Sequence, residues 1–405
     1  MFLSAGEASG DHYGAQVIAG VRGRLPGATF AGLGGLEMER AGLRRVVRAE
    51  DVAVMGITEI LRHVPRIYGS YRRLAGSIRA ERPDVAVLID FPDVNFRLAK
   101  HLRRAGVPVV WFVSPQLWAW KRGRLRWVQE RVDRMLVIFP FEEDFYRARG
   151  VAAEFVGHPL AVGWEPVGSR EAYAAAFGLD ARRRWIALLP GSRAKEVKAN
   201  LYTMLQAAIL LEGEREEEGF EFLLPVASTL DAGWVEGEIA AWVARRKHFG
   251  GKPLPKLTIV PEARAALTHA RASVVASGTA TVLAAVVGNP FVVVYRVSGL
   301  TFRLAKRLVR YPVEIPAEVD EDGNLPVAMV NLVAGRRLVP ELLNERFTPE
   351  GVVAALRELL EDGDAREGQM RGLAEVRRRL EAPGMVGGVG RVVETVLDLL
   401  GRGRP

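Results

Sequence analysis

Short apolar runs alternate with stretches of helical periodicity over most of the chain. In the first part of the chain, six of these runs are predicted strands: residues 1–5, 29–33, 85–89, 109–113, 134–138 and 154–156. Five more follow, at residues 185–189, 220–225, 256–260, 272–275 and 290–295. The amphipathic stretches between them predict β-α-β units, and hence an α/β fold of parallel sheets with helices on both faces.

The two series of strands are separated near residues 159–169, which predicts two doubly wound, Rossmann-like domains. A chain of 405 residues is also too long for one ordinary core. We expect domains at residues 1–165 and 166–382, with residues 383–405 as a separate C-terminal segment. In such sheets the strand ends and helix N-termini face the ligand, so the predicted ligand site is an interdomain cleft.

A net charge of +8 favours an anionic partner: nucleic acid, a membrane surface or a phosphorylated substrate. The chain has no cysteine, which excludes disulfides, thiol catalysis and thiolate zinc sites. The six histidines are scattered and no acidic pair suggests a metal, so we expect no metal and no cofactor. The chain shows neither a signal peptide nor an apolar run of roughly eighteen residues, so we expect a cytoplasmic protein.

Two loops of the second domain suit a phosphate. In LLPGSRAKEV, Gly191 allows close approach to the backbone, Ser192 offers a hydroxyl and Arg193 offers a planar fork. The other interpretation of this loop is an ordinary turn with a surface arginine. The loop lacks the Gly-Lys-Ser/Thr ending of a P-loop.

The second phosphate-compatible loop is ASGTATVL, where Ser277, Gly278 and Thr279 lead from a strand directly into a helix. Free amides and the helix dipole there would favour an anion, although Ser277 and Thr279 could simply be helix caps. An arginine fork and a helix start together suit the diphosphate of a nucleotide-sugar better than a triphosphate.

In the first domain, LSAGEASGDHYGA is a loop between a strand and a helix, with a capped helix start as its alternative. Glu7, Ser9 and Gly10 are its acceptor-side candidates. VLIDFPDVNF places Asp90 and Asp93 where a buried strand ends. Asp90 is expected to cap the next helix, and Asp93 is the candidate base for an attacking hydroxyl.

In WFVSPQLWAWKRGR, Ser114, Gln116, Trp118 and Trp120 could line an acceptor pocket, although one of the two tryptophans is expected in the core. Residues 56–79 and 302–312 mix apolar and basic side chains. Both stretches suit an anionic bilayer surface. The alternative for the first is a core-facing helix with solvated arginines, and the alternative for the second is an anionic substrate site.

Five stretches together resemble bacterial lipid-A-disaccharide synthase: AGEASGDHYGA, AVMGITEIL, FVSPQLWAWKRGR, LLPGSRAKEV and ASGTATVL followed by YRVSGLTFRLAKRLVR. The resemblance extends in order over nearly the whole chain, to MVNLVAGRRLVPELLNE. LLPGSR is shared with other nucleotide-sugar transferases, whereas SPQLWAW and TFRLAKRLV are much more specific.

The resemblance implies a GT-B fold and a peripheral enzyme at the inner face of the cytoplasmic membrane. Its reaction would join UDP-2,3-diacylglucosamine to 2,3-diacylglucosamine 1-phosphate (lipid X) with inversion, giving a β-1,6-linked disaccharide and UDP. Asp93 would be the base, the two phosphate loops would hold the diphosphate, and Asn331 matches a family position near the donor. The segment after Pro383 would pack back on the first domain, and the protein would be a monomer or homodimer.

Two features depart from the family pattern. Transferases of this type commonly carry a glutamate that binds the ribose in the helix after the small-residue turn, and Leu283 occupies that position here. Residues 314–329 are also longer than expected. Ribose recognition must therefore differ from the usual pattern.

Two other classes of function remain open. One is another GT-B enzyme, such as a UDP-N-acetylglucosamine epimerase or the peptidoglycan N-acetylglucosaminyltransferase. The second is a basic membrane- or nucleic-acid-binding module. We expect no nucleic-acid partner, because the arginines are spread over helices without a compact platform of aromatic and basic side chains.

Overall fold

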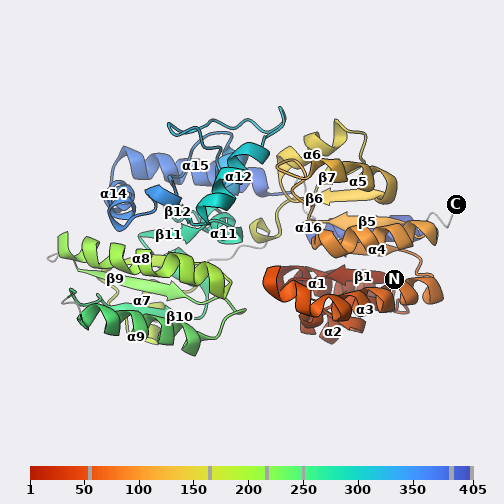
Figure 1. Cartoon of the computed structure of the whole chain (residues 1–405), viewed down its shortest axis with the longest axis horizontal. Coiled ribbons are helices and arrows are strands. Elements are labelled where there is room, and N and C mark those ends of the chain that lie inside the picture. The colour runs from red at the N-terminus through yellow and green to blue at the C-terminus, as the bar shows by residue number, and fades with distance from the viewer. Residues whose placement is uncertain (53–56, 163–166, 215–218, 249–250, 383–386, 402–405) are drawn as a thin grey trace. The chain divides into compact units, whose positions relative to one another are not determined.

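The computed structural model describes residues 1–52, 57–162, 167–214, 219–248, 251–382 and 387–401, without the side chains of residues 57–67, 214, 247, 248, 300, 301 and 305. The chain divides into two compact units. The first unit contains residues 1–162, 310–314 and 380–405, and the second contains residues 163–309 and 315–379. Each unit is built on one parallel sheet (Figure 1).

The first sheet has seven strands in the order β3-β2-β1-β4-β5-β6-β7, all parallel. Their bounds are β1 (Phe2–Ala5), β2 (Phe30–Gly34), β3 (Leu43–Arg48), β4 (Ala86–Ile89), β5 (Val109–Phe112), β6 (Arg134–Val137) and β7 (Ala153–Phe155). The central strands are buried along their whole length, as expected of a parallel sheet covered on both faces.

Two groups of helices pack against this sheet. One group contains α1 (Ala8–Arg24), α2 (Leu36–Ala41) and α16 (Gly388–Gly401). The other contains α3 (Ile57–Glu81), α4 (Pro92–Arg104) and α5 (Leu125–Arg131), while α6 (Pro140–Arg147) connects β6 to β7. Within the first unit, the last helix of the chain, α16, thus packs on the first helix, α1.

The second sheet has six parallel strands in the order β10-β9-β8-β11-β12-β13. Their bounds are β8 (Arg184–Leu189), β9 (Phe220–Pro225), β10 (Leu257–Val260), β11 (Ala272–Ala276), β12 (Phe291–Tyr295) and β13 (Glu341–Leu343). The helices of this unit are α7 (Arg170–Phe177), α8 (Ala194–Glu214), α9 (Ala232–His248), α10 (Ala263–His269), α11 (Thr279–Val287), α12 (Gly299–Leu308), α13 (Met329–Ala334), α14 (Pro349–Leu360) and α15 (Asp364–Leu380).

The core of the second unit lies between the sheet and the pair α8 and α14. Leu201, Leu205, Val352 and Leu356 from these helices are almost completely buried. This packing holds β8 and its following loop in place, because α8 begins only five residues after the strand ends.

The predicted α/β fold with two doubly wound sheets is confirmed. Each of the eleven predicted strands is present, with bounds that differ by a residue or so, and the described residues contain two further strands, β3 and β13. Both lie at sheet edges. Three of the six residues of β3 are arginines and β13 has only three residues, so neither forms the apolar run that identifies a buried strand.

Candidate functional site

The two predicted phosphate loops start at the centre of the second sheet. β8 and β11 are hydrogen-bonded neighbours, with Leu189 in register with Val275. The strand order reverses between them, because β9 and β10 follow β8 on one side while β12 and β13 follow β11 on the other. Ligands of open α/β sheets bind at such a switch point, beyond the carboxyl ends of the strands. Residues 190–193 and 277–279 therefore emerge at the position that this fold uses for binding.

The loop after β8 is held by three side chains from neighbouring segments. The Asn200 amide donates to the Pro190 carbonyl (2.9 Å), and the Thr229 hydroxyl donates to the Ser192 carbonyl (2.6 Å). Glu196 accepts from the Ser192 amide (3.0 Å) and from Nη1 of Arg193 (3.1 Å). Ser192 and Arg193 are nevertheless exposed, so an anionic ligand could reach both.

The loop after β11 exposes the start of a helix. Gly278 is the residue before α11 and has a φ of 148°, and no side chain caps the helix amides. Gly278 and Thr279 are exposed, and no atom lies within 4 Å of the position that a Cβ of Gly278 would take. Ser277 and Thr279 are thus not the caps that the alternative interpretation required. The uncapped amides and the dipole of α11 suit an anion.

Tyr295 ends the strand next to β11 and is partly exposed. Burial raises the pKa of its phenol, and the negative charge of Glu196 raises it further. The carboxylate of Glu196 therefore acts electrostatically across the carboxyl ends of this sheet. Leu283, which replaces the expected ribose-binding acid, is half-buried in α11.

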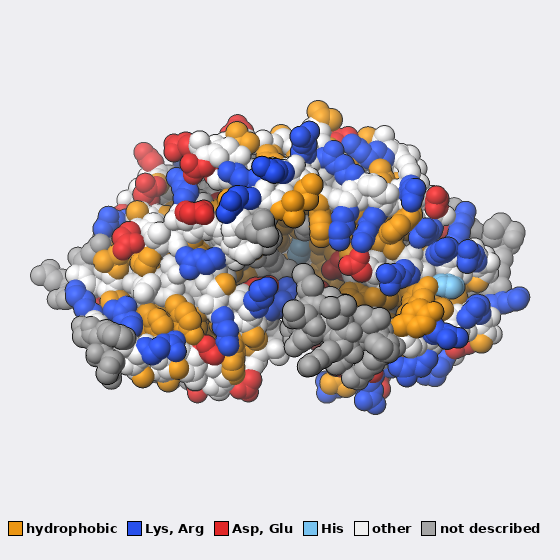
Figure 2. Space-filling view, viewed as in Figure 1, with side chains coloured by type: hydrophobic (Ala, Val, Ile, Leu, Met, Phe, Trp, Pro, Cys, Tyr) orange, Lys and Arg blue, Asp and Glu red, His pale blue; other side chains and the backbone are white. Residues whose placement is uncertain are grey.

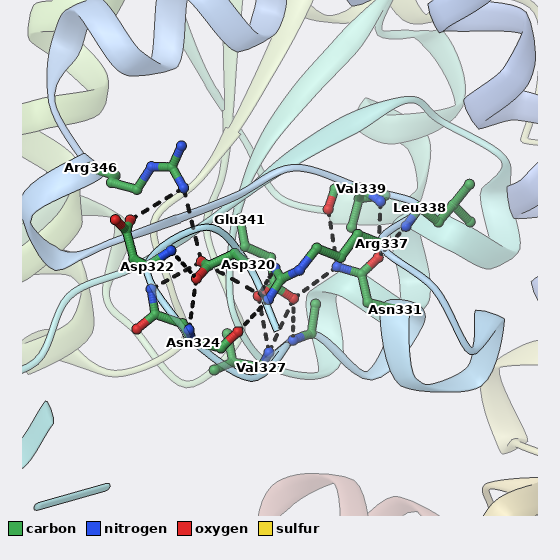
Figure 3. A network of polar contacts seen from close by, with 11 residues as sticks. Asp320, Asp322, Asn324, Val327, Asn331, Arg337, Leu338, Val339, Glu341 and Arg346 are labelled. Carbon is green, nitrogen blue, oxygen red and sulfur yellow. Dashed lines mark hydrogen bonds and ion pairs between the residues drawn. The ribbon is translucent and has the colours of Figure 1, made fainter. Parts of the chain in front are cut away.

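Asn331 has a structural role that sequence reasoning did not predict (Figure 3). It is 1% exposed. Its amide nitrogen donates to the Val339 carbonyl and to Glu341, while its oxygen accepts from the amides of Leu338 and Val339. All four of its hydrogen-bonding positions are used within the protein, so this side chain has none left for a direct donor contact.

Of residues 314–329, which are longer than the family pattern, residues 315–328 form no helix or strand. Two carboxylates hold them (Figure 3). Asp320 accepts from the amides of Asp322 and Asn324, and Arg337 and Arg346 lie within 4.0 Å of it. Burial raises the pKa of Glu341, which accepts from the amides of Val327 and Ala328.

In the first unit, the corresponding switch point lies between β1 and β4, where Ala5 is in register with Ile89. Asp90 and Phe91 follow β4, and both have left-handed backbone, with φ of 43° and 48°. The ring of Phe91 covers Gly6, where a Cβ would lie 2.5 Å from the ring. The loops after β1 and β4 therefore contact each other, and only glycine fits at position 6.

The buried Asn95 holds the strained turn after β4. Its amide donates to the Asp90 carbonyl (2.7 Å) and lies within 3.4 Å of the carbonyls of Ile89 and Ser4. Its oxygen accepts from the Ser4 hydroxyl (2.6 Å). Asn95 thus connects β1 to the turn that precedes Asp93.

Asp93 lies in the first turn of α4, directly after Pro92. Its side chain is 72% exposed and pairs with Arg124 at 2.7 Å. Arg124 belongs to the segment that follows β5, so this ion pair connects the carboxyl ends of two neighbouring strands. The carboxylate is accessible and oriented, as a base for an incoming hydroxyl must be.

The three candidate residues that follow β1 differ in their exposure. Glu7 and Ser9 are exposed, whereas Gly10 is buried close to Ala5. Asp11, in the same motif, turns away to accept from the amides of Gly35, Glu37 and Met38, and so caps the start of α2. Asp11 is therefore structural.

Ser114 and Trp118 do not line an open pocket as predicted, because both are buried. The Ser114 hydroxyl (2.7 Å) and the Trp118 indole nitrogen (3.1 Å) donate to the same oxygen of Glu142, which is also buried. The Trp118 ring also contacts Phe141 and Tyr311. Trp120 is the exposed tryptophan of the pair, at 51%, and Lys121 lies 4.0 Å from its ring centre.

Residues 310–314 pack on the first unit beside this loop. Arg122 donates to the carbonyls of Trp118 and Arg310, and Arg149 forms an ion pair with Glu314 (2.9 Å). Residues 114–122 are thereby held from two sides, by Glu142 and by residues 310–314.

Sequence reasoning missed Glu142, Glu196 and Asn95 as residues that organise these loops. Glu142 and Glu196 each occupy the third position of a helix, where a glutamate commonly bonds back to the preceding turn. Their position in the helix was the signal by which the sequence could have identified these two glutamates. Asn95 carried no comparable signal, because its partner Ser4 lies 91 residues away.

Among the described residues, no group of three or more acidic or histidine side chains could hold a metal ion. No helix in this part of the chain is long and apolar enough to cross a membrane. Lys and Arg side chains are scattered over the visible face of each unit (Figure 2).

Comparison with known protein sequences points to one family. A family model described as lipid-A-disaccharide synthetase matches residues 1–383. A lipid-A-disaccharide synthase from Acidobacterium capsulatum is 51% identical over 405 residues, covering 99% of this chain and 96% of the relative. One from Koribacter versatilis is 48% identical over 383 residues, covering 94% and 93%.

Solved structures match at the level of the fold. The calicheamicin glycosyltransferase CalG4 has a TM-score of 0.58 at 16% identity, with 99% of this chain and 98% of that chain covered. A co-structure of MnaA from S. aureus with UDP also has a TM-score of 0.58, at 13% identity and coverages of 100% and 98%. The predicted GT-B fold is confirmed by these likenesses.

Proposed function

Because the chain belongs to the lipid-A-disaccharide synthase family of UDP-sugar glycosyltransferases, we propose that it joins two acylated glucosamines. The donor is UDP-2,3-diacylglucosamine and the acceptor is 2,3-diacylglucosamine 1-phosphate. The 6-hydroxyl oxygen of the acceptor forms a bond to the anomeric carbon of the donor. The bond from that carbon to the diphosphate breaks, so UDP leaves and a β-1,6-linked disaccharide forms with inversion.

Asp93 is the proposed base. It takes the proton of the 6-hydroxyl as that oxygen attacks, which is the task of a carboxylate within hydrogen-bonding distance of the nucleophile. Its exposure at the start of α4 and its ion pair with Arg124 support this role. Glu7, directly before α1, and Ser9, in the first turn of α1, are exposed at the same edge of the sheet and are the proposed acceptor contacts.

The proposed leaving-group site is formed by residues 190–193 and 277–279. The Arg193 guanidinium and the uncapped amides of α11 would stabilise the negative charge that grows on UDP. The single observation that carries this assignment is topological: both loops follow the two strands that meet at the switch point of the second sheet.

The test is a mass-spectrometric assay of the purified protein with both acylated sugars. We expect disaccharide and UDP only when both substrates are present. Asp93→Asn should abolish turnover and leave UDP binding unchanged, whereas Arg193→Ala should weaken both. The matched control Asp144→Asn, at an exposed position of α6, should remain active. Absence of product from the unmodified protein would overturn the proposed reaction, and turnover by Asp93→Asn would exclude Asp93 as the base.

We also propose that α12 rests on the inner face of the cytoplasmic membrane, where acylated substrates are located. Leu304 and Leu308 are one turn apart and are 54% and 65% exposed. Arg303 and Arg307, likewise one turn apart, flank these leucines, which is the pattern of an interfacial helix on anionic lipid. For residues 56–79, residue 56 and the side chains of residues 57–67 lie outside the described residues.

Cosedimentation with vesicles of phosphatidylglycerol and phosphatidylcholine tests the role of α12. The double variant Leu304→Asn, Leu308→Asn should bind these vesicles several-fold more weakly than the unmodified protein. Met370→Asn, which changes another exposed apolar side chain of the second unit, is the control. Equal vesicle binding by all three proteins would contradict the assignment.

A further inference from the structure

The proposed diphosphate loop, residues 190–193, already binds a carboxylate of the protein itself, that of Glu196. Glu196 is the third residue of α8, and its two carboxylate oxygens accept from the Ser192 amide (3.0 Å) and from Nη1 of Arg193 (3.1 Å). Gly191 makes this approach possible, because a Cβ there would lie 2.6 Å from Cβ of Glu196. The carboxylate therefore lies directly against the loop.

The groups that Glu196 occupies are the ones that the proposed function assigns to the donor. A phosphate needs backbone amides and a guanidinium, and a carboxylate competes for the same donors. The side chain of Glu196 is 39% exposed and that of Arg193 is 52% exposed. The carboxylate can therefore turn into solvent without opening the core.

We propose that Glu196 is an internal counter-anion that sets the affinity for the donor. While the site is empty, its carboxylate accepts the hydrogen bonds that the loop donates. The diphosphate of an incoming nucleotide displaces the carboxylate. The inference rests on the proposed function, because it takes residues 190–193 as the diphosphate loop. It also gives a reason for a loop that carries a guanidinium to keep one fixed geometry before a ligand arrives.

The alternative role for Glu196 is that of a helix cap that only braces the loop. Substitution of Glu196 by glutamine distinguishes the two roles, because glutamine also serves as a cap at the third helix position but carries no charge. Glu196→Gln keeps the brace and removes the competing anion. Glu367→Gln is the matched control, since Glu367 is an exposed glutamate of the second unit that also pairs with an arginine, Arg371.

The experiment is isothermal titration of each full-length protein with UDP. We expect Glu196→Gln to bind UDP about fivefold more tightly, the factor that one unit charge exerts on another at about 4 Å in water-like surroundings. Glu196→Ala should also bind UDP more tightly, because the diphosphate then accepts the hydrogen bonds of the loop in place of the carboxylate. Glu367→Gln should match the unmodified protein.

Two results would overturn the inference, and they differ in what else they exclude. If the unmodified protein binds UDP but Glu196→Gln binds it equally or more weakly, Glu196 is a brace and the proposed function stands. If the unmodified protein and both Glu196 variants all fail to bind UDP, the donor loop itself is misassigned, and the proposed function fails together with the inference.

Discussion

Two ionisable side chains buried in the first unit should affect its stability in opposite ways as the pH changes. Burial raises the pKa of the Glu142 carboxyl from 4.5 to about 7, although Ser114, Trp118 and backbone amides donate hydrogen bonds to it. Burial lowers the pKa of the His158 imidazole from 6.5 to about 4. Nδ1 of His158 accepts from the Leu160 amide, which is consistent with a neutral ring.

The direction in which each group changes the stability with pH depends on whether the folded or the unfolded state binds more protons. Between pH 4.5 and 6.5, folded Glu142 keeps a proton that the unfolded chain has lost, so its stabilising contribution is complete below pH 4.5 and is lost by pH 7. In the same interval, folded His158 lacks a proton that the unfolded chain carries. Its contribution is therefore complete above pH 6.5 and is lost by pH 4.

The two contributions are equal in size. For each group the folded and unfolded pKa values differ by about 2.5 (7 minus 4.5, and 6.5 minus 4). At about 1.4 kcal/mol for each pKa unit, each group changes the free energy of unfolding by about 3 kcal/mol. Together they nearly cancel in the unmodified protein.

Single substitutions should reveal each contribution. Relative to the unmodified protein, Glu142→Gln should gain about 3 kcal/mol of stability as the pH rises from 4.5 to 7, because only the His158 contribution remains. His158→Asn, whose amide oxygen can replace Nδ1 as an acceptor, should lose about the same amount. Glu130→Gln, at an exposed glutamate, is the control and should follow the unmodified protein.

The assay is hydrogen exchange in urea at several pH values, read on peptides from residues 134–156 so that it reports the first unit. The free energy of opening is plotted against pH for each protein. If Glu142→Gln and the unmodified protein have parallel plots, Glu142 does not hold a proton in the folded state at pH 6, and the reasoning is wrong.

Substitutions at three further positions test how the loops and helix starts are held. Asn95→Ala should lower the free energy of unfolding by about 2 to 4 kcal/mol in urea titrations, because it leaves the Ser4 hydroxyl and the Asp90 carbonyl without their partner. Asp11→Ala should cost about 2 to 3 kcal/mol in the same titrations, since three backbone amides at the start of α2 lose their acceptor. At position 113, where φ is 62°, glycine should give a protein about 1 kcal/mol more stable than alanine does, the reverse of the order expected within a strand. A higher thermal midpoint for Val113→Ala than for Val113→Gly would contradict this expectation.

The fold was predictable because both sheets are built from short apolar runs. The eleven predicted strands stand out in the sequence as short apolar runs, and all of them except β7 and β10 are buried over nearly their whole length. The parallel arrangement follows from the helices between them. The edge strands β3 and β13 were not predictable in this way, since half of the residues of β3 are arginines and β13 has only three residues.

The candidate loops were predictable for a related reason. Parallel strands end at the same edge of a sheet, so the segments after β1 and β4, and those after β8 and β11, come together once the strand order is known. Their internal organisation was not predictable. It depends on contacts between distant residues, such as Ser114 with Glu142 and Ser4 with Asn95, and on the saturation of Asn331 by its own surroundings.

Backbone strain adds an argument of a different kind for the function of the first unit. Six described residues other than glycine have left-handed backbone, and four of them lie in the loops that follow β4 and β5: Asp90, Phe91, Val113 and Lys121. Each costs on the order of 1 to 3 kcal/mol and persists only where its surroundings fix it. Here the Asn95 amide fixes the first turn, and Nε1 of Trp111 donates to the Val113 carbonyl at the second. A fold selected for stability alone would relieve such strain with glycine. Strain concentrated at the edge that carries Asp93 therefore favours this edge, rather than the helical faces, as the place where the first unit acts on its substrate.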